Sequence, residues 1–118
     1  MSKSANAGEL RTPVYFIRTD RETDRNGYPV TTEVNVFGEG RYVLAKWVNA
    51  HGTEAFMAMQ MQLREPATIT MRYSPLINEQ LLVYRGNDPK PYEVISIDNV
   101  QERNTWLEIK VQRRVEGR

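Results

Sequence analysis

Apolar and polar residues alternate in several short segments of the chain, which is the pattern of half-buried strands. The segment Trp106 to Arg113 shows it most clearly, because Leu107, Ile109 and Val111 are each separated by one polar residue. In an extended strand these three side chains point to one face and the polar ones to the other. The pattern therefore predicts a strand with one face in the core and one in solvent.

A second alternating segment covers Thr68 to Tyr73. Ile69, Met71 and Tyr73 are predicted on one face of this strand, and Arg72 is predicted on the opposite, polar face. Further short runs of apolar, β-branched and aromatic residues predict the remaining strands. They are Val14 to Ile17, Val34 to Val36, Arg41 to Val48, Leu81 to Tyr84 and Tyr92 to Ile97.

Turn-forming residues separate these segments. Gly38-Glu39-Gly40 predicts a tight turn that joins its two flanking strands in a hairpin, because glycine readily adopts the positive φ such a turn needs. Asp20 to Gly27 predicts a long polar loop that extends to about Thr32. Tyr73 to Gln80 and Arg85 to Pro91 predict two further loops. We expect the first two long loops to order on contact with a partner.

The segment Thr53 to Arg64 favours a helix. Its residues are mostly good helix formers, and Phe56, Met59 and Leu63 recur at helical spacing. Pro66 biases the preceding residue towards extended backbone and should end the helix by about that point. Alternating methionines leave a strand as the alternative. The methionines at positions 57, 59, 61 and 71 are expected in the core, with an adaptable binding surface as the second interpretation.

Together these elements predict a mainly β protein, a small antiparallel β-barrel or sandwich of about six strands with one short helix at about residues 53–64. Strands and helices do not alternate, which argues against a doubly wound fold. We expect a single β-rich domain over residues 12–114. A flexible N-terminal arm is predicted at residues 1–11, and a frayed C-terminal tail at residues 115–118.

Composition narrows the class of protein. The chain has 118 residues, no cysteine and a formal net charge of +1. The lack of cysteine excludes a disulfide scaffold, a thiolate zinc site and a cysteine nucleophile. No apolar run approaches the roughly 18 residues that suggest a membrane span, and the N-terminus lacks the apolar core of a signal peptide. The sequence therefore predicts a soluble, intracellular product with no membrane partner.

Residues suited to catalysis are few. His51 is the only histidine and is expected as an exposed loop residue, since an isolated titratable group rarely marks a site. No serine lies in a nucleophile elbow, and no glycine-rich phosphate loop is present. We therefore expect no enzymatic activity and no cofactor.

One segment has the spacing of a calcium-binding loop. With Glu22 as the first position of an EF-hand loop, Asp24 and Asn26 fall at two ligand positions and Glu33 at the last. Glutamate is a poor first ligand, Pro29 stands where an apolar residue is usual, and the flanks are strand-like. A solvated hairpin loop without metal is the preferred interpretation.

Nucleic-acid binding is the main alternative function. An OB-like barrel stacks single-stranded bases on aromatic side chains, and Tyr84 and Trp106 both have basic residues nearby in the sequence. The net charge of +1 and the interleaved glutamates argue against this function, because a dedicated binder usually has a clear basic excess.

A long but loose set of motifs runs from Leu44 to the C-terminus. It comprises Ala45-Lys46-Trp47, Gly52-Thr53-Glu54-Ala55-Phe56, Ile69-Thr70-Met71-Arg72-Tyr73 with Ile77, Leu82-Val83-Tyr84-Arg85-Gly86, Tyr92-Glu93-Val94-Ile95 and Asn99. Through these motifs the chain resembles the phage head–tail joining family, the head closure or head–tail adaptor proteins. In the first forty residues, Asp24 to Gly27 supplies the Asp-x-x-Gly of that family.

The resemblance implies a β-barrel-like structural protein of a tailed phage virion, without catalytic residues, that forms a connector ring. The implied partners are further copies of the chain, the portal or its adaptor above, and a tail-side joining protein below, with DNA at most passing through the ring. The implied location is the virion, after assembly in the host cytoplasm. The candidate interface residues are Arg72, Tyr73, Ile77, Trp106, Asp24 and Asn26.

Overall fold

The computed structural model describes residues 7–115, and within this range seven strands form one antiparallel sheet. The helix α1 (Gly52–Gln60) connects the third and fourth strands, and the short 3-10 helices η1 (Ala7–Glu9) and η2 (Val100–Glu102) precede the first and last strands. The strands are β1 (Thr12–Thr23), β2 (Pro29–Asn35), β3 (Val43–Asn49), β4 (Ala67–Arg72), β5 (Leu82–Arg85), β6 (Tyr92–Asn99) and β7 (Trp106–Arg113).

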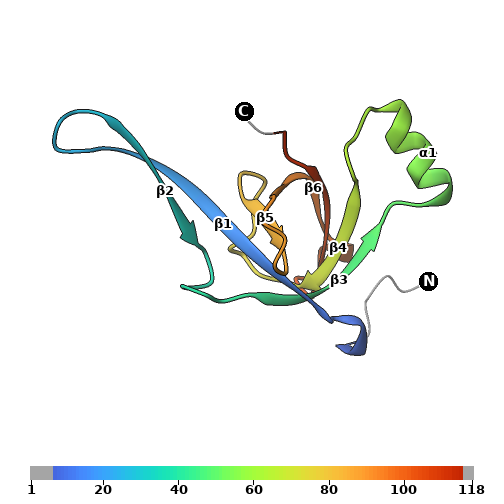
Figure 1. Cartoon of the computed structure of the whole chain (residues 1–118). Coiled ribbons are helices and arrows are strands. Elements are labelled where there is room, and N and C mark those ends of the chain that lie inside the picture. Colours follow the sequence, from blue (N-terminus) through green and yellow to red (C-terminus); the bar gives the residue numbers. More distant parts are fainter. Residues whose placement is uncertain (1–6, 116–118) are drawn as a thin grey trace.

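The strand β1 closes this sheet into a barrel. The hydrogen-bonded order is β2-β1-β3-β4-β7-β6-β5, and Val14 to Ile17 of β1 also pair with β5. All strands except β2 therefore form a closed barrel of six strands, and β2 lies outside it (Figure 1). The prediction of a mainly β fold, an antiparallel barrel or sandwich of about six strands with one helix, is confirmed, and the barrel is the alternative that forms.

The barrel interior is the hydrophobic core. Phe16, Ile69 and Ile109 are fully buried there, together with Leu107 and Val111 on either side of Ile109. The predicted bounds and orientation of the last strand are therefore confirmed. The core also contains Val14, Ala45, Ala67, Met71, Leu81, Val83 and Tyr92.

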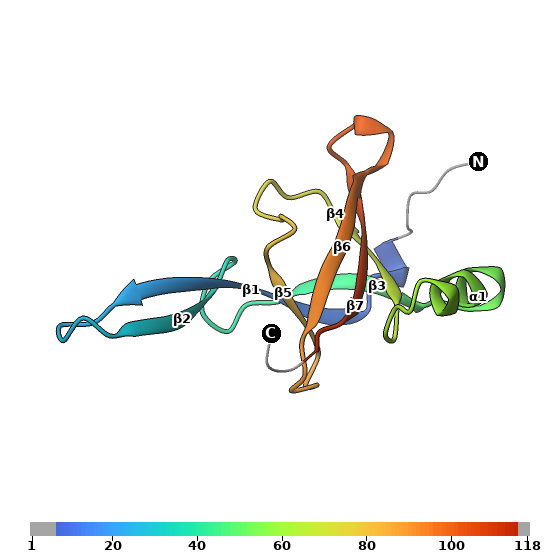
Figure 2. The same cartoon turned by 90° about the horizontal axis from the view of Figure 1, so that it is seen from above.

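Beyond the barrel, β1 and β2 continue as a long hairpin (Figures 1 and 2). Its register runs from Ile17 opposite Asn35 to Thr23 opposite Pro29. The predicted polar loop from Asp20 to about Thr32 is thus wrong outside the tight turn between the two strands. Because both faces of this ribbon are in solvent, no buried face imposes the alternation that would reveal a strand.

The hairpin predicted around Gly38-Glu39-Gly40 does not form. Gly38 and Gly40 have φ values of +113° and +72°, so the bend itself is where the sequence predicts it. However, β2 and β3 both pair with β1 rather than with each other. The glycines specify only that the backbone changes direction here. Which strands then pair depends on contacts throughout the sheet.

The helix α1 is shorter and more exposed than predicted. It ends at Gln60 rather than near Arg64, because Met61 forms its C-cap and Gln62 has a φ of +59°. Ala58 is its buried residue, whereas Met57, Met59 and Met61 are 56%, 76% and 66% exposed. The prediction that these three methionines fill the core is wrong, and Met71 on β4 is the one that is buried.

Part of the predicted N-terminal arm lies against the barrel. Leu10 is buried, and the Glu9 carboxylate lies 3.1 Å from the Lys46 ammonium group. Residues 1–6 of that arm and residues 116–118 of the predicted tail lie outside the described range.

Candidate functional site

Arg72 and Trp106 face each other across strands β4 and β7. The guanidinium carbon of Arg72 lies 5.8 Å from the centre of the Trp106 ring, within the range of a cation–π contact. Arg72 is exposed, as the sequence predicts, and also lines a hollow of about 420 Å³ with Leu10, Tyr42 and Leu44. Two of the predicted interface residues thus form one rim of the barrel.

Tyr73 and Ile77 belong to the loop that follows β4 and are half-buried against the core. The backbone N–H of Tyr73 donates a 2.9 Å hydrogen bond to the carbonyl of Thr105, beside Trp106. Asn78 accepts a 2.9 Å hydrogen bond on its side chain from the Gln80 N–H, so this loop has internal order of its own. Tyr73 and Ile77 therefore anchor the loop and expose only part of their surface.

Asp24 and Asn26 lie at the tip of the β1–β2 hairpin, away from the barrel (Figure 1). The Asp24 carboxylate oxygen Oδ1 accepts hydrogen bonds from the backbone N–H groups of Asn26 (2.8 Å) and Tyr28 (2.9 Å). Gly27 completes the turn with a φ of +82°. The observed role of Asp24 is to close the turn, and the six predicted interface residues fall into two separate groups.

The hairpin has one face that the sequence analysis missed. Val30 and Val34 lie on the same face of β2, and Tyr28, just before β2, continues that alternation; the three are 37%, 37% and 67% exposed. Val30 and Val34 pair with Glu22 and Arg18 of β1, so a charged row borders the apolar stripe. The sequence analysis treated residues up to about Thr32 as a loop, so it did not place Tyr28 and Val30 on one strand face with Val34.

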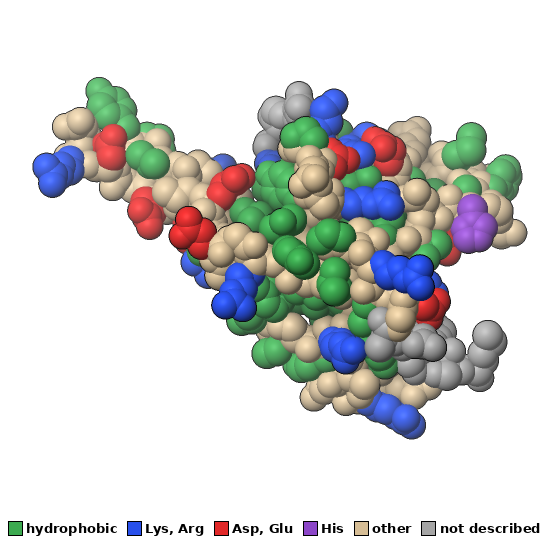
Figure 3. Space-filling model, turned by 60° about the horizontal axis from the view of Figure 1, so that its bottom comes forward, with side chains coloured by type: hydrophobic (Ala, Val, Ile, Leu, Met, Phe, Trp, Pro, Cys, Tyr) green, Lys and Arg blue, Asp and Glu red, His purple; other side chains and the backbone are tan. Residues whose placement is uncertain are grey.

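Exposed apolar side chains also gather elsewhere. Figure 3 shows a continuous hydrophobic area on the bottom face of the barrel, next to the base of the hairpin. Outside the hairpin and α1, the large hydrophobic residues that are exposed in the described range are Tyr42, Leu44 and Leu76. Contiguous apolar surface of this kind commonly marks a site of protein–protein contact.

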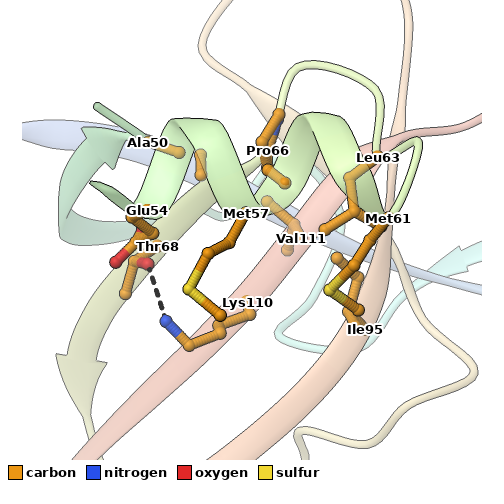
Figure 4. Close-up of a pocket in the computed structure, with 12 residues that line it drawn as sticks. Ala50, Glu54, Met57, Met61, Leu63, Pro66, Thr68, Ile95, Lys110 and Val111 are labelled. Carbon is orange, nitrogen blue, oxygen red and sulfur yellow. Dashed lines mark hydrogen bonds between the residues drawn. The ribbon is translucent and has the colours of Figure 1, made fainter. Parts of the chain in front are cut away.

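A groove lies between α1 and the barrel, as Figure 4 shows. Its volume is about 230 Å³. Met57 and Met61 point from the helix towards Lys110 of β7 and Ile95 of β6. The Lys110 ammonium group lies 3.4 Å from the Thr68 hydroxyl at one side of the groove. The remaining lining residues are Ala50, Glu54, Ala58, Leu63, Pro66, Ala67 and Val111.

Arg113, at the end of β7, organises the main polar cluster. Its guanidinium group contacts the Glu65 carboxylate at 3.1 Å and the Asp88 carboxylate at 3.0 Å. The hydrogen bond from Arg113 holds the pKa of Glu65 below its ordinary value. The backbone N–H of Lys90 and then Arg113 lower the pKa of Asp88 in the same way. Because one cation contacts two carboxylates, this cluster has a structural role. It links the end of β7 to the loop that contains Glu65 and to the loop that contains Asp88.

The described residues offer little for other chemistry. They contain no group of three or more histidine, cysteine, aspartate or glutamate side chains that could hold a metal ion. Residues 7–115 also contain no helix that is long and apolar enough to cross a membrane. His51 is exposed before α1, where its Nδ1 lies 3.2 Å from the Asn49 carbonyl oxygen.

The two aromatic residues considered for nucleic-acid stacking lie on different parts of the barrel. Tyr84 is on β5 and Trp106 is on β7, with β6 between these strands. Burial raises the pKa of Tyr84, which faces Tyr15 across the β1–β5 pairing. An OB-fold has five strands, whereas this barrel has six. Val83, next to Tyr84, pairs with Tyr92, which pairs with Arg113 at the other end of β7 from Trp106. Tyr84 and Trp106 therefore lie towards opposite ends of these strands and do not form one stacking surface.

Comparisons with known proteins agree with the predicted resemblance. The solution structure of protein SF1141 from Shigella flexneri 2a is similar, with a TM-score of 0.67 and 20% sequence identity over 95% of this chain and 99% of that chain. This likeness supports the fold alone. No curated protein matches the chain. The model of the family described as "Phage head completion protein" matches residues 5–114. The chain therefore belongs to the phage head completion protein family, and with it to the structural proteins that join phage head and tail.

Proposed function

We propose that copies of this chain form a connector ring below the portal or its adaptor. In this ring the β1–β2 hairpin is an arm that packs against the neighbouring subunit. The observation that carries the proposal is the exposed apolar stripe on a hairpin that extends from the barrel. Such a stripe has no role in the core of its own subunit. Its burial against a neighbour would remove apolar surface from water.

The mechanics of the hairpin support an arm that is completed by assembly. A two-stranded ribbon without a packed face is only marginally stable in water. The outer edge of β2 also leaves backbone groups available, because β2 pairs with β1 on one side and lies at the end of the sheet order. A neighbouring subunit that covers this ribbon would supply packing and, at the edge, further backbone hydrogen bonds.

The rim around Arg72 and Trp106 is the proposed docking surface for a virion partner outside the ring, the portal or adaptor on one side or the tail-side joining protein. Arg72, Tyr42 and Leu44 combine an exposed cation with exposed apolar surface. Arginine and aromatic residues are the types that contribute most to interface energy. Tyr73 and Ile77 would position the adjoining loop.

The proposed ring has no catalytic task and acts in the virion after assembly in the host cytoplasm. DNA would at most pass through it. With a net charge of +1, the chain would make few of the phosphate contacts that hold a nucleic acid in place.

The test is co-sedimentation of the purified protein with portal-bearing heads lacking this protein. We expect the wild-type protein to saturate the heads at several copies per portal. The variant Tyr28→Ser, Val30→Ser, Val34→Ser should bind at reduced occupancy with an unchanged circular dichroism spectrum. The matched control changes Thr19→Ser and Thr31→Ser on the opposite face of the hairpin and should bind like wild type.

Single-stranded DNA binding is measured in parallel at low and moderate salt. Saturation at one copy per portal would refute the ring. An absence of head binding, together with tight DNA binding that depends on Trp106 or Tyr84, would replace the proposed function with that of a nucleic-acid-binding module.

A further inference from the structure

The apolar side chains on α1 and at its C-cap Met61 are only partly covered by their own subunit. The helix spans Gly52–Gln60, and Ala58 is its buried residue. Phe56, Met57, Met59 and Met61 are each more than half exposed. Short helices in proteins owe most of their stability to the packing of an apolar face. An exposed apolar face on such a helix is therefore expected to be covered by another molecule.

The groove beside this helix suits protein side chains. Its volume of about 230 Å³ is below the roughly 300–1,000 Å³ of typical small-molecule sites. Met57 and Met61 border it from the helix, and Ile95 and Val111 border it from the barrel (Figure 4). Flexible methionine side chains adapt to the shape of an incoming apolar surface.

The β1–β2 hairpin presents a matching surface. Tyr28, Val30 and Val34 form its apolar stripe, and Thr32 lies between the two valines on the same face. Charged residues of both signs, Arg18 and Glu22, lie beside that stripe. The groove likewise carries one charge of each sign, from Glu54 and Lys110. Both surfaces are therefore apolar and carry charges of both signs at their border, so that each charge on one surface can pair with an opposite charge on the other.

The two surfaces lie on opposite sides of the molecule. The hairpin and α1 extend from the barrel in opposite directions in both views (Figures 1 and 2). The molecule is elongated, with extents of 56 × 32 × 27 Å. A hairpin cannot reach the groove of its own subunit in this arrangement. A cyclic ring needs this kind of arrangement, in which one patch meets a different patch on the next copy.

We infer that the Tyr28–Val30–Val34 face of one subunit packs into the α1 groove of the next subunit. The occupant of the groove is thus a second copy of this chain. The inference rests on the proposed ring and deepens it, because it names the surface that receives the hairpin arm.

Disulfide cross-linking tests this contact directly, because the natural chain has no cysteine. Protein carrying Val30→Cys is mixed with protein carrying Met61→Cys, both on portal-bearing heads and free at high concentration, and then oxidised. The expected product is a covalent dimer of one copy of each variant. A chain that carries both substitutions should give a ladder of higher oligomers on heads.

Matched controls use neighbouring positions on the wrong faces. Thr31→Cys lies next to Val30 on the opposite face of the hairpin, and Met59→Cys lies on the helix outside the groove lining. Both should cross-link at least tenfold less than the Val30–Met61 pair. Retained circular dichroism spectra would show that each variant is folded.

The outcomes separate this inference from the proposed function. Multicopy binding to heads without the Val30–Met61 product would leave the ring standing and overturn the contact. Equal cross-linking by the control positions would overturn it as well, and so would cross-linking of Met61→Cys to a portal or tail protein in place of Val30. The Val30–Met61 product in free protein that fails to bind heads would support the contact and overturn the proposed function. If the protein does not bind heads and the Val30–Met61 product does not form, both the contact and the proposed function are overturned.

Discussion

The guanidinium carbon of Arg113 lies 4.1 Å from the centre of the Tyr92 ring, so that the cation covers the face of the aromatic side chain. The Tyr92 ring also contacts the Trp47 ring in an edge-to-face arrangement, with 4.9 Å between the ring centroids. The Arg85 guanidinium carbon lies over Trp47, also at 4.9 Å. This alternation of cations and rings joins β7, β6, β3 and β5 at one end of the barrel.

Loss of Arg113 should destabilise the fold. Arg113→Ala removes two charge-assisted carboxylate contacts and the cation–π contact, and we expect the free energy of unfolding to fall by about 2 kcal/mol. Urea unfolding followed by circular dichroism measures this change. The control is Arg18→Ala, which breaks an exposed ion pair with Asp20 and should cost less than about 1 kcal/mol. Equal effects of the two variants would contradict the role assigned to Arg113.

Stability should decrease in acid because of Glu65 and Asp88. The Arg113 hydrogen bond lowers the pKa of Glu65, and the Lys90 N–H followed by Arg113 lowers that of Asp88. Between the folded and unfolded pKa values the unfolded chain binds more protons. This contribution is therefore complete above the unfolded pKa values and is lost as the pH falls through the folded ones.

The measurement is urea unfolding at about pH 7 and about pH 3. The double variant Glu65→Gln, Asp88→Asn should be less stable than wild type at the higher pH and should lose less stability on acidification. A pH dependence as steep as that of wild type would show that other carboxyl groups control acid unfolding.

Truncation of the core should have the largest effect. Ile109 is fully buried at the centre of β7, so Ile109→Ala should cost roughly 2–5 kcal/mol through lost burial and a cavity. The exposed neighbour Lys110, changed to alanine, should shift the urea midpoint only slightly. An unchanged midpoint for Ile109→Ala would be incompatible with the inward orientation of this strand face.

Arg72 should matter for assembly rather than for folding. Arg72→Ala removes an exposed side chain whose contact with Trp106 is worth about 1 kcal/mol or less. We expect a folded monomer with reduced binding to portal-bearing heads. Lys90→Ala, an exposed cation on the loop between β5 and β6, is the control and should bind normally. Loss of the circular dichroism signal in Arg72→Ala would make Arg72 a structural residue.

The individual strands differ in how far sequence could predict them. β7 was predictable to its bounds, because a strand with one buried face alternates apolar and polar residues. β1 was predictable only in its barrel segment, around Val14 to Ile17. Its extension to Thr23 pairs with β2 in solvent, where any polar residue is tolerated and no pattern is imposed.

The candidate site was only partly visible in the sequence. The face of Arg72 followed from strand alternation, but its neighbour Trp106 followed only from the register of β4 against β7. Asp24 was noticed for its loop spacing, although its carboxylate serves the turn. The apolar stripe from Tyr28 to Val34 and the groove beside α1 were missed, since both depend on which surfaces the barrel leaves uncovered.

By itself the sequence determined the β class, the inward faces of β4 and β7, the positions of the glycine bends and the family motifs. These properties are local, because strand alternation and backbone preference act over a few residues. The tertiary structure alone decided that β1 closes the barrel, that β2 joins it in a hairpin arm, and that Met57, Met59 and Met61 stay more than half exposed. Pairing and exposure depend on contacts between distant segments, and the same residues satisfy their local preferences in several such arrangements.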